Sequence, residues 1–179
     1  MSFVINNSSD IEIETERLRL VPFSLEMVRA ALENKTELAR LLGATVPPEW
    51  PNSDFDEILP MILQSREENL AQAEWDRLII HKAEGTLIGD LGLKGGPNQA
   101  GTADLGYGIV PGYQRQGYAY EAAQALVNWA FKEKGVKCIT ADCLDNNFGS
   151  IRVLEKLGMR RLKHEDKLFY WELLAKAKI

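Results

Sequence analysis

Residues 104–119 read DLGYGIVPGYQRQGYA, and this stretch decides the fold class. Its first half, Asp104 to Val110, is a mostly apolar run that predicts a strand, and the apolar residues that follow Ala119 recur at helical spacing. Between the two elements, Gly117 lets the backbone approach a ligand closely, and the first free N–H groups of the helix point outward with the positive end of its dipole. The stretch therefore predicts an anion site, to which Arg115 adds a formal charge, unless Gly117 only eases the turn into the helix.

The pattern on both sides of this stretch alternates between strands and helices. Upstream we expect a strand over residues 17–22, a helix from Leu25 to Leu42 that stops at Gly43, a second helix over about residues 56–72, and a hairpin with strands 78–81 and 87–93. Downstream we expect a long helix that ends by Gly135, a strand over 138–144, a short helix capped by Asn147, and a last strand over 168–173. Pro60 suits the second helix only in its first turn. The pattern predicts an α+β fold with a mixed, mainly antiparallel sheet flanked by helices.

Length and composition predict one domain that spans residues 1–179. Apolar residues make up 45% of the chain and charged residues 26%, which is typical of a soluble globular protein, and no stretch has the length of a membrane span. Met1 to Asp10 lacks the basic start and apolar run of a secretory signal, so we expect a cytoplasmic protein with reduced thiols. The net charge of −5 argues against a broad nucleic-acid-binding surface.

The loop before the long helix carries a recognisable motif. Gln114, Gly117 and Ala119 form the pattern Gln-x-x-Gly-x-Ala, which resembles the acetyl-coenzyme A motif Gln/Arg-x-x-Gly-x-Gly/Ala of the GNAT superfamily of N-acetyltransferases. Residues 105–109 precede it like the fourth strand of that family, and residues 118–122 continue it like the helix that follows. The resemblance implies a GNAT-like sheet in which one pair of strands is splayed to hold the cofactor.

Two further segments extend the resemblance over nearly the whole chain. Residues 145–150 and 154–159 look like the second motif of the family, Asn-x-x-Ser followed by a Glu-Lys-Leu-Gly-Phe-like helix end. Residues 15–20 resemble the first strand of the branch that includes the ribosomal-protein N-terminal alanine acetyltransferases. The likeness is specific from Asp104 to Met159 and weak from Gly43 to Trp75.

The resemblance assigns the cofactor, acetyl-coenzyme A, to one end of the sheet. It implies that the exposed backbone of Ile109 and Val110 pairs with the pantetheine arm and that a main-chain N–H there faces the thioester oxygen. Asn147 would fix the cofactor arm, cap its helix, or do both. The pyrophosphate would bind the backbone amides of Gln114, Arg115, Gln116, Gly117, Tyr118 and Ala119.

Acetyl transfer by direct attack needs a neutral amine, so some group must receive a proton. Asp104 stands where the family often places an acidic residue and is the candidate base, and the alternative is a solvated strand residue. Leu154 occupies the place of the tyrosine that commonly protonates the leaving thiolate. Ser150 is the candidate substitute for that acid; alternatively its hydroxyl only starts the helix, and water supplies the proton.

The resemblance implies that the acceptor is a primary amine and places residues 44–55 beside the thioester, so we expect this segment to form one wall of the acceptor site. Glu49 and Trp50 would favour a cationic amine by charge and cation–π attraction, unless Trp50 only fills the core between the first two helices. A peptide or protein α-amine is easier to deprotonate than a lysine, and a polyamine or antibiotic amine is the alternative acceptor. A non-catalytic coenzyme A-binding module is the remaining alternative. We expect a monomer or a homodimer.

Other chemistries fail on spacing. Pro111 occupies the place of the third glycine of a dinucleotide fingerprint, and the chain has no Gly-Lys pair for a phosphate-binding loop. The two histidines, His81 and His164, do not make a metal cluster, so we expect no metal.

Overall fold

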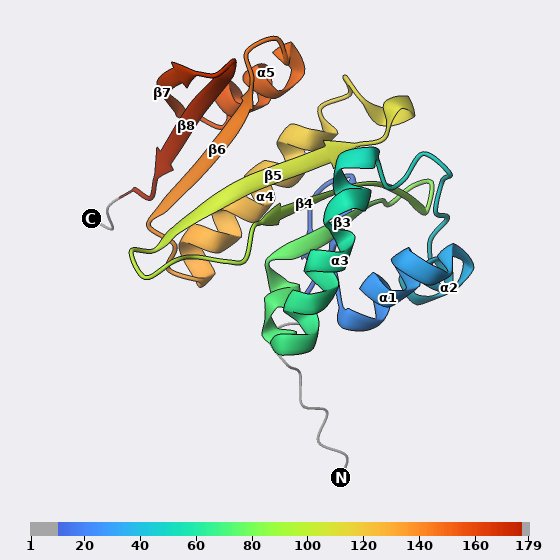
Figure 1. Cartoon of the computed structure of the whole chain (residues 1–179). Helices are drawn as coiled ribbons and strands as arrows, with labels where there is room; N and C mark the ends of the chain where they lie inside the picture. Colours follow the sequence, from blue (N-terminus) through green and yellow to red (C-terminus); the bar gives the residue numbers. More distant parts are fainter. Residues whose placement is uncertain (1–10, 177–179) are drawn as a thin grey trace.

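The computed structural model describes residues 11–176, and Met1 to Asp10 therefore lies outside the described part of the chain. Within that range the strands form a single eight-stranded sheet in the order β1-β2-β3-β4-β5-β6-β8-β7 (Figure 1). Neighbouring strands are antiparallel except β5 and β6, which are parallel. The fold is therefore the mixed, mainly antiparallel α+β sheet that the sequence predicts.

The strands occur where the sequence predicts them, with two additions. β7 has no buried face, since every residue from Arg160 to Glu165 is exposed, and β1 is only two residues long, so neither has a detectable alternation. The bounds are β1 Ile13–Glu14, β2 Leu18–Pro22, β3 Asp76–His81, β4 Thr86–Leu93, β5 Thr102–Ile109, β6 Cys138–Leu144, β7 Arg160–Glu165 and β8 Leu168–Leu174.

The first expected helix is wrong in one respect, because it is two helices, α1 (Leu25–Glu33) and α2 (Lys35–Leu42). Asn34 lies between them in an extended conformation and caps α2 by accepting hydrogen bonds from the backbone of the next turn. The expected stop at Gly43 is confirmed by its left-handed conformation, with φ of 60°.

The helix α3 (Ser53–Glu68) begins earlier than expected. Asn52 caps it by accepting a hydrogen bond from the N–H of Phe55, so the helix starts within residues 44–55, the segment expected to form a wall of the acceptor site. Pro60 consequently lies in the helix interior rather than in the first turn, which corrects the sequence prediction. The long helix α4 (Tyr118–Glu133) and the short helix α5 (Phe148–Lys156), with Asn147 as its cap, are confirmed.

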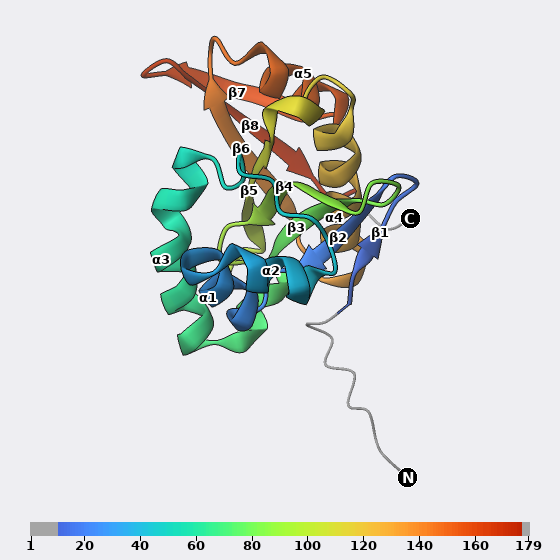
Figure 2. The ribbon, with the colours of Figure 1, turned by 90° about the vertical axis from the view of Figure 1, so that its right-hand side faces the viewer.

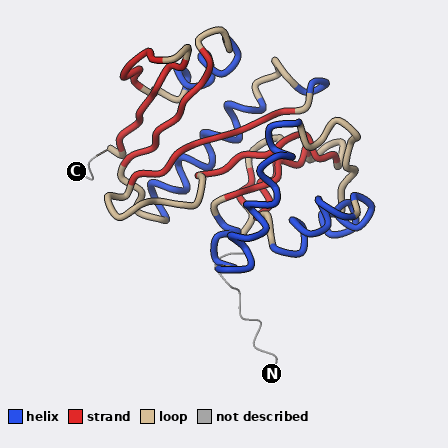
Figure 3. The backbone as a smooth tube through the Cα atoms, viewed as in Figure 1, coloured by secondary structure: helices blue, strands red, loops and turns tan. Residues whose placement is uncertain are grey.

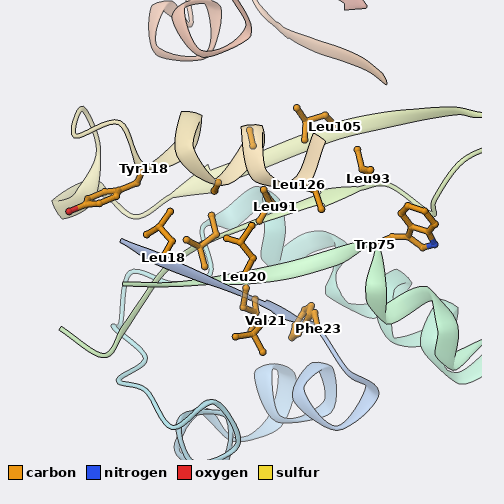
Figure 4. Close-up of a cluster of buried hydrophobic side chains, with 14 of the residues drawn as sticks. Leu18, Leu20, Val21, Phe23, Trp75, Leu91, Leu93, Leu105, Tyr118 and Leu126 are labelled. Atoms are coloured by element: carbon orange, nitrogen blue, oxygen red, sulfur yellow. The ribbon is translucent and has the colours of Figure 1, made fainter. Parts of the chain in front are cut away.

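The helices cover both faces of the sheet (Figure 2). α4 packs on one face, and α1, α2 and α3 lie on the opposite face. Figure 4 shows Leu91, Leu105 and Leu126 between the strands and α4, and all three are nearly inaccessible to solvent. Burial of such side chains contributes about 1.5–3 kcal/mol each, so the central strands and α4 form a firm base for the ends of the strands.

The sheet parts between β5 and β6. The two strands pair only from Thr102 to Asp104, opposite Cys138 to Thr140, and then diverge toward the loop before α4 and toward α5 (Figures 1 and 3). β5 continues along β4, and β6 continues along β8, so each strand keeps one partner. The predicted splayed pair is thus present, and it leaves one edge of each strand facing a gap. Within residues 11–176, no helix is both long and apolar enough to cross a bilayer.

Candidate active site

The loop between β5 and α4 presents a row of free backbone donors. Gln114 closes a turn on Pro111, and the first helical bond of α4 runs from Glu121 N–H to Gly117 O. Among the described residues, no hydrogen-bond acceptor receives the N–H groups of residues 115–120, and α4 has no side-chain cap. This row lies at the positive end of a 16-residue helix, so it is suited to bind an anion.

The backbone of this loop adopts conformations that point successive N–H groups the same way. Arg115 has φ of 62° and Gly117 has φ of 85°, both in the left-handed region that glycine adopts without strain. Such left-handed residues make concave rows of N–H groups that bind anions. A β-carbon added to Gly117 would meet only the Arg17 guanidinium, at 3.5 Å, so the approach to Gly117 is open. We refer to residues 114–119 as the cradle.

Arg17, at the start of β2, supports the cradle and was not expected from the sequence. Its guanidinium donates to Gln116 O at 3.1 Å and pairs with Glu121 of α4 at 2.7 Å. It also lies 4.2 Å above the ring of Tyr118, whose hydroxyl is 3.0 Å from His81 Nε2. Arg17 lies 99 residues before Gln116 in the chain, so only the fold brings it to the cradle.

The structure assigns different roles to the two residues expected to pair with a cofactor arm. Val110 donates its N–H to Ile88 O and accepts a hydrogen bond from Tyr113 N–H, so its backbone is already paired and the expectation is corrected for this residue. Because strand groups alternate in direction, Ile109 presents its N–H and C=O to the gap. Gln114 Nε2 donates to Ile109 O at 2.9 Å, which leaves the Ile109 N–H facing the gap.

The opposite rim of the gap is the start of α5. Asn147 Oδ1 accepts a hydrogen bond from Ser150 N–H at 3.1 Å, which confirms Asn147 as a helix cap and leaves its side-chain N–H groups free for other partners. Tyr107 spans the gap from β5 and donates its hydroxyl to Ser150 O at 3.4 Å. Burial raises the pKa of Tyr107 to about 12. Leu154 is 1% exposed and belongs to the core, so its side chain does not face the gap as a proton donor would.

Asp104 lies at the point where β5 and β6 part. Its carboxylate pairs with Lys94 Nζ at 2.7 Å and accepts a hydrogen bond from Thr140 Oγ1 at 2.8 Å. Lys94 also lies over Gly106, since a β-carbon there would be 3.1 Å from Lys94 Cε. A proton transferred to Asp104 would therefore have to compete with Lys94 for the carboxylate.

Trp50 is a core residue, which decides between the two interpretations of the sequence. It is 1% exposed, and its ring packs against Phe23 and Phe55 at centroid distances of 6.4 and 5.9 Å. The ring therefore does not face an acceptor, and the cation–π interpretation of Trp50 is corrected. Glu49, the next residue toward the amino terminus, is exposed.

The indole N–H of Trp50 leads to a residue that sequence reasoning missed. Trp50 Nε1 donates to Asp90 Oδ2 at 2.9 Å, and Asp90 is only 6% exposed. Asp90 pairs with Gly108 across the β4–β5 ladder, so its side chain shares the face of Gly108, opposite α4. Asp90 lies in a strand whose other residues, apart from Thr86 at its start, are apolar or glycine, and one acidic residue in such a run carries no pattern that marks it.

Gly106 and Gly108 leave the backbone of β5 bare on this face. Asn52 contributes the other polar group here, because a β-carbon on Gly108 would lie 3.0 Å from Asn52 Nδ2 and 3.8 Å from Asp90 Oδ1. Both glycines are partly exposed and Asn52 is exposed, so solvent reaches this part of the sheet. We call this strip of bare strand, bordered by Asn52, Asp90, Lys94 and Asp104, the acceptor face. Residues 11–176 contain no group of three or more His, Cys, Asp or Glu side chains that could hold a metal ion.

Comparisons with known proteins agree with this geometry. The model of the acetyltransferase (GNAT) domain family matches residues 17–160. The N-acetyltransferase YjdG of Bacillus subtilis (strain 168) is 37% identical over 82% of this chain and 88% of its own length. The ribosomal-protein-S5-alanine acetyltransferase of Vibrio fischeri superposes with a TM-score of 0.66 at 17% identity, over 93% of this chain and 97% of its own. The ribosomal alpha-N-protein acetyltransferase RimL, solved with coenzyme A, gives a TM-score of 0.64 at 18% identity, over 92% and 98% of the two chains.

Proposed function

The chain belongs to the GNAT acetyltransferase family, and from that premise we propose that it moves the acetyl group of acetyl-coenzyme A to the α-amine of a peptide or protein. N-acetyltransferase activity with acetyl-coenzyme A as co-substrate follows from the family. The choice of acceptor is the proposal. The observation that carries it is the acceptor face, which places carboxylates beside the bare strand at the edge of the gap.

The residues around the gap fit acetyl-coenzyme A. The cradle offers its unpaired N–H row to a pyrophosphate, and a β-carbon at Gly117 would project toward Arg17 alone. The free edge of β5 at Ile109 offers a strand-like partner to an extended pantetheine arm. The Ile109 N–H is then the donor that would stabilise the oxygen of the thioester as charge develops on it. Asn147, with its side-chain N–H groups free, borders the same gap from α5.

The acceptor face favours an amine that arrives as a cation. Asp90 and Asp104 lie on one face of β4 and β5, and exposed Glu49 lies in the segment beside Trp50. An α-amine has a reference pKa of about 8, against about 10.4 for a lysine, so it loses its proton more readily near neutral pH. The peptide terminus is therefore the acceptor that the site can deprotonate at the lower free-energy cost. RimL and the alanine acetyltransferase, whose names describe protein acceptors, share this fold.

The sequence suggests chemical roles for Asp104 and Ser150, and each role has an alternative. Asp104 would lose its contact with Lys94 on receiving a proton from the amine, so we do not make it the base of this proposal. Ser150, at the start of α5, would supply a proton to the leaving thiolate. Neither role is required for the choice of acceptor, because a thiolate with a pKa of about 8.5 also takes a proton from water.

The test is a matched panel of acceptors. One peptide carries a free α-amine and no lysine, a second carries a blocked α-amine and one lysine, and spermidine and an aminoglycoside represent small-molecule amines. Release of the coenzyme A thiol gives the rate, and mass spectrometry locates the acetyl group. We expect kcat/KM for the free α-amine peptide to exceed that for the blocked peptide by at least about tenfold.

A faster reaction with lysine, spermidine or the aminoglycoside would overturn the peptide-terminus proposal and leave the family assignment intact. If no amine is acetylated although calorimetry shows that acetyl-coenzyme A binds, the chain acts as a coenzyme A-binding module.

A further inference from the structure

Asp90 is a buried carboxylate with an incomplete set of partners. Within residues 11–176, Trp50 Nε1 is the only donor to it, and that bond occupies Oδ2. An ionised carboxylate accepts at about four lone-pair sites, and burial without donors is costly. Oδ1 is directed toward the bare backbone of Gly108, beside the side-chain amide of Asn52. The unpartnered oxygen therefore points into the acceptor face.

Asp76 provides a comparison within the same face. Asp76 lies on β3 opposite Gly92 of β4, and its side chain is partly buried, with 19% of its surface exposed. Asp76 forms an ion pair with Arg66, which also donates to Phe23 O, so its charge is compensated. A buried acid that only holds the fold is expected to be paired in this way. In the part of the chain that the structure describes, no cation pairs with Asp90, which indicates that its partner arrives from outside the chain.

We propose that Asp90 is the catalytic residue that binds the ammonium group of the acceptor and receives its proton. This inference rests on the proposed function, since it names the group that prepares the amine for attack. Trp50 acts as a positioning residue, because its indole N–H fixes Oδ2 and leaves Oδ1 for the acceptor. The position suits the task, since Gly108 directly precedes Ile109, whose N–H faces the gap.

The proton and electron balance of this step is simple. The ammonium N–H bond breaks, its proton moves to Asp90 Oδ1, and the freed lone pair forms the C–N bond with the thioester carbonyl carbon. The C–S bond then breaks, and the second proton of the attacking nitrogen neutralises the thiolate, relayed by the Ser150 hydroxyl or by water. Asp90 returns its proton to solvent, so the overall reaction releases one proton for each ammonium that is acetylated.

The electrostatic surroundings of Asp90 support this role. Burial raises the pKa of Asp90 to about 7, the hydrogen bond from Trp50 opposes that rise, and the charge of Asp76 adds to it. The packed elements around Asp90 also carry Asp76 of β3, which pairs with Arg66 of α3, and Lys35 of α2, which donates to Trp50 O at 2.7 Å. The Lys94–Asp104 pair borders the same face. A base with a pKa near the working pH transfers protons most effectively.

The experiment compares the pH profiles of kcat/KM for the best amine acceptor in the intact chain and in variants. The wild type should lose activity below about pH 7, and this fall is the acidic limb of its pH profile. Asp90→Asn should lower kcat/KM at pH 7 by about 100-fold or more without changing the KM of acetyl-coenzyme A, and the acidic limb should disappear. Trp50→Phe removes the N–H and keeps the ring, so the limb should move to higher pH. Glu57→Gln, on the exposed surface of α3, is the matched control.

An acidic limb that persists in Asp90→Asn, or that disappears only in Asp104→Asn, would overturn the proposal and assign the base to Asp104. If the acidic limb of the pH profile lies at the same pH in Trp50→Phe as in the wild type, the proposal is also overturned, even if Asp90→Asn does not fold. An NMR titration of carboxyl-labelled aspartates tests Asp90 independently of turnover: a pKa near 4 contradicts the inference. If the pKa is near 7 but no amine is acetylated, the proposed function fails and this inference fails with it.

A stability measurement separates the carboxylate from its surroundings. A folded pKa of about 7 lies above the reference value of 3.8, so the folded wild type loses stability as pH rises from about 4 to about 7. Asp90→Asn lacks that loss, so its Tm relative to wild type should become more favourable over this interval and level off above pH 8. A constant Tm difference across the interval would contradict a buried, ionising Asp90.

Discussion

The candidate active site has two sides, a cofactor side and the acceptor face, and they differ in whether backbone or side chains form them. The cofactor side consists of backbone: the unpaired N–H groups of residues 115–120, the left-handed turn at Gly117 and the free edge of β5 at Ile109. The acceptor face consists of side chains from α3, β4 and β5 set around two glycines. A site made of backbone depends on conformation, whereas a site made of side chains depends on which residues the fold brings together. The two sides should therefore respond differently to substitution.

The strongest expected effect is on the cofactor side, at Gly117. Gly117→Glu introduces a side chain and a negative charge where an anion is expected to bind, and it places a non-glycine residue at φ of 85°. We expect affinity for coenzyme A, measured by calorimetry, to fall by at least about 100-fold while the circular dichroism spectrum stays native.

Gly112 offers the matched control in the same loop. A β-carbon there would meet no atom within 4 Å, and its φ is not in the positive range, so Gly112→Ala should bind coenzyme A like the wild type. Unchanged affinity in Gly117→Glu would show that the cradle does not hold the cofactor.

The second prediction concerns the acceptor side, where Trp50 and Glu49 should behave differently. Trp50→Ala empties a buried site beside Phe23 and Phe55 and should reduce the free energy of unfolding by about 3–5 kcal/mol in urea titrations. Glu49→Gln changes an exposed group and should leave stability within about 0.5 kcal/mol. If Glu49 attracts the amine, its substitution should raise the KM of the acceptor alone. An unchanged acceptor KM would remove Glu49 from the site.

The smallest effect is expected at Arg115, whose side chain is exposed at the rim of the cradle. Arg115→Ala should weaken coenzyme A binding about threefold at low salt, and the difference should shrink at high salt because an exposed charge is screened. Arg115→Lys keeps the charge and should retain the wild-type affinity. A large loss that does not depend on salt would mean that Arg115 supports the loop through its backbone rather than through its charge.

The sequence predicted the strand, loop and helix around the cradle because these parts are contiguous. Gln114, Gly117 and Ala119 lie in one loop, and the helix that follows has an unambiguous apolar face. The sequence did not predict that Arg17 supports the cradle, because Arg17 contacts Gln116 and Glu121 only in the folded chain. Val110 was misassigned for a local reason, since its N–H turns toward Ile88.

The surroundings of Trp50 and Asp90 were predicted less well, because their contacts join distant parts of the chain. The sequence singled out the segment around Trp50 but did not predict where its side chain points. The ring packs in the core, and its indole N–H donates to Asp90 of β4. Asp90 appears in the sequence as one acid in an apolar strand, and its burial and single hydrogen bond exist only in the folded chain. The same limit explains the break at Asn34, where a local cap divides a continuous helical pattern.

The parting of β5 and β6 has a consequence for the ligand-free protein. A sheet normally has two outer edges, and this one carries two more inside, where β5 beyond Asp104 and β6 beyond Thr140 lack each other as partners. Exposed strand edges recruit other chains, and at β7 a fully exposed strand rich in charged residues discourages such pairing. The inner edges have no comparable protection. We expect the empty enzyme to aggregate on heating through the open gap, and a bound ligand that lies along β5 to act as the missing strand and keep the protein in solution.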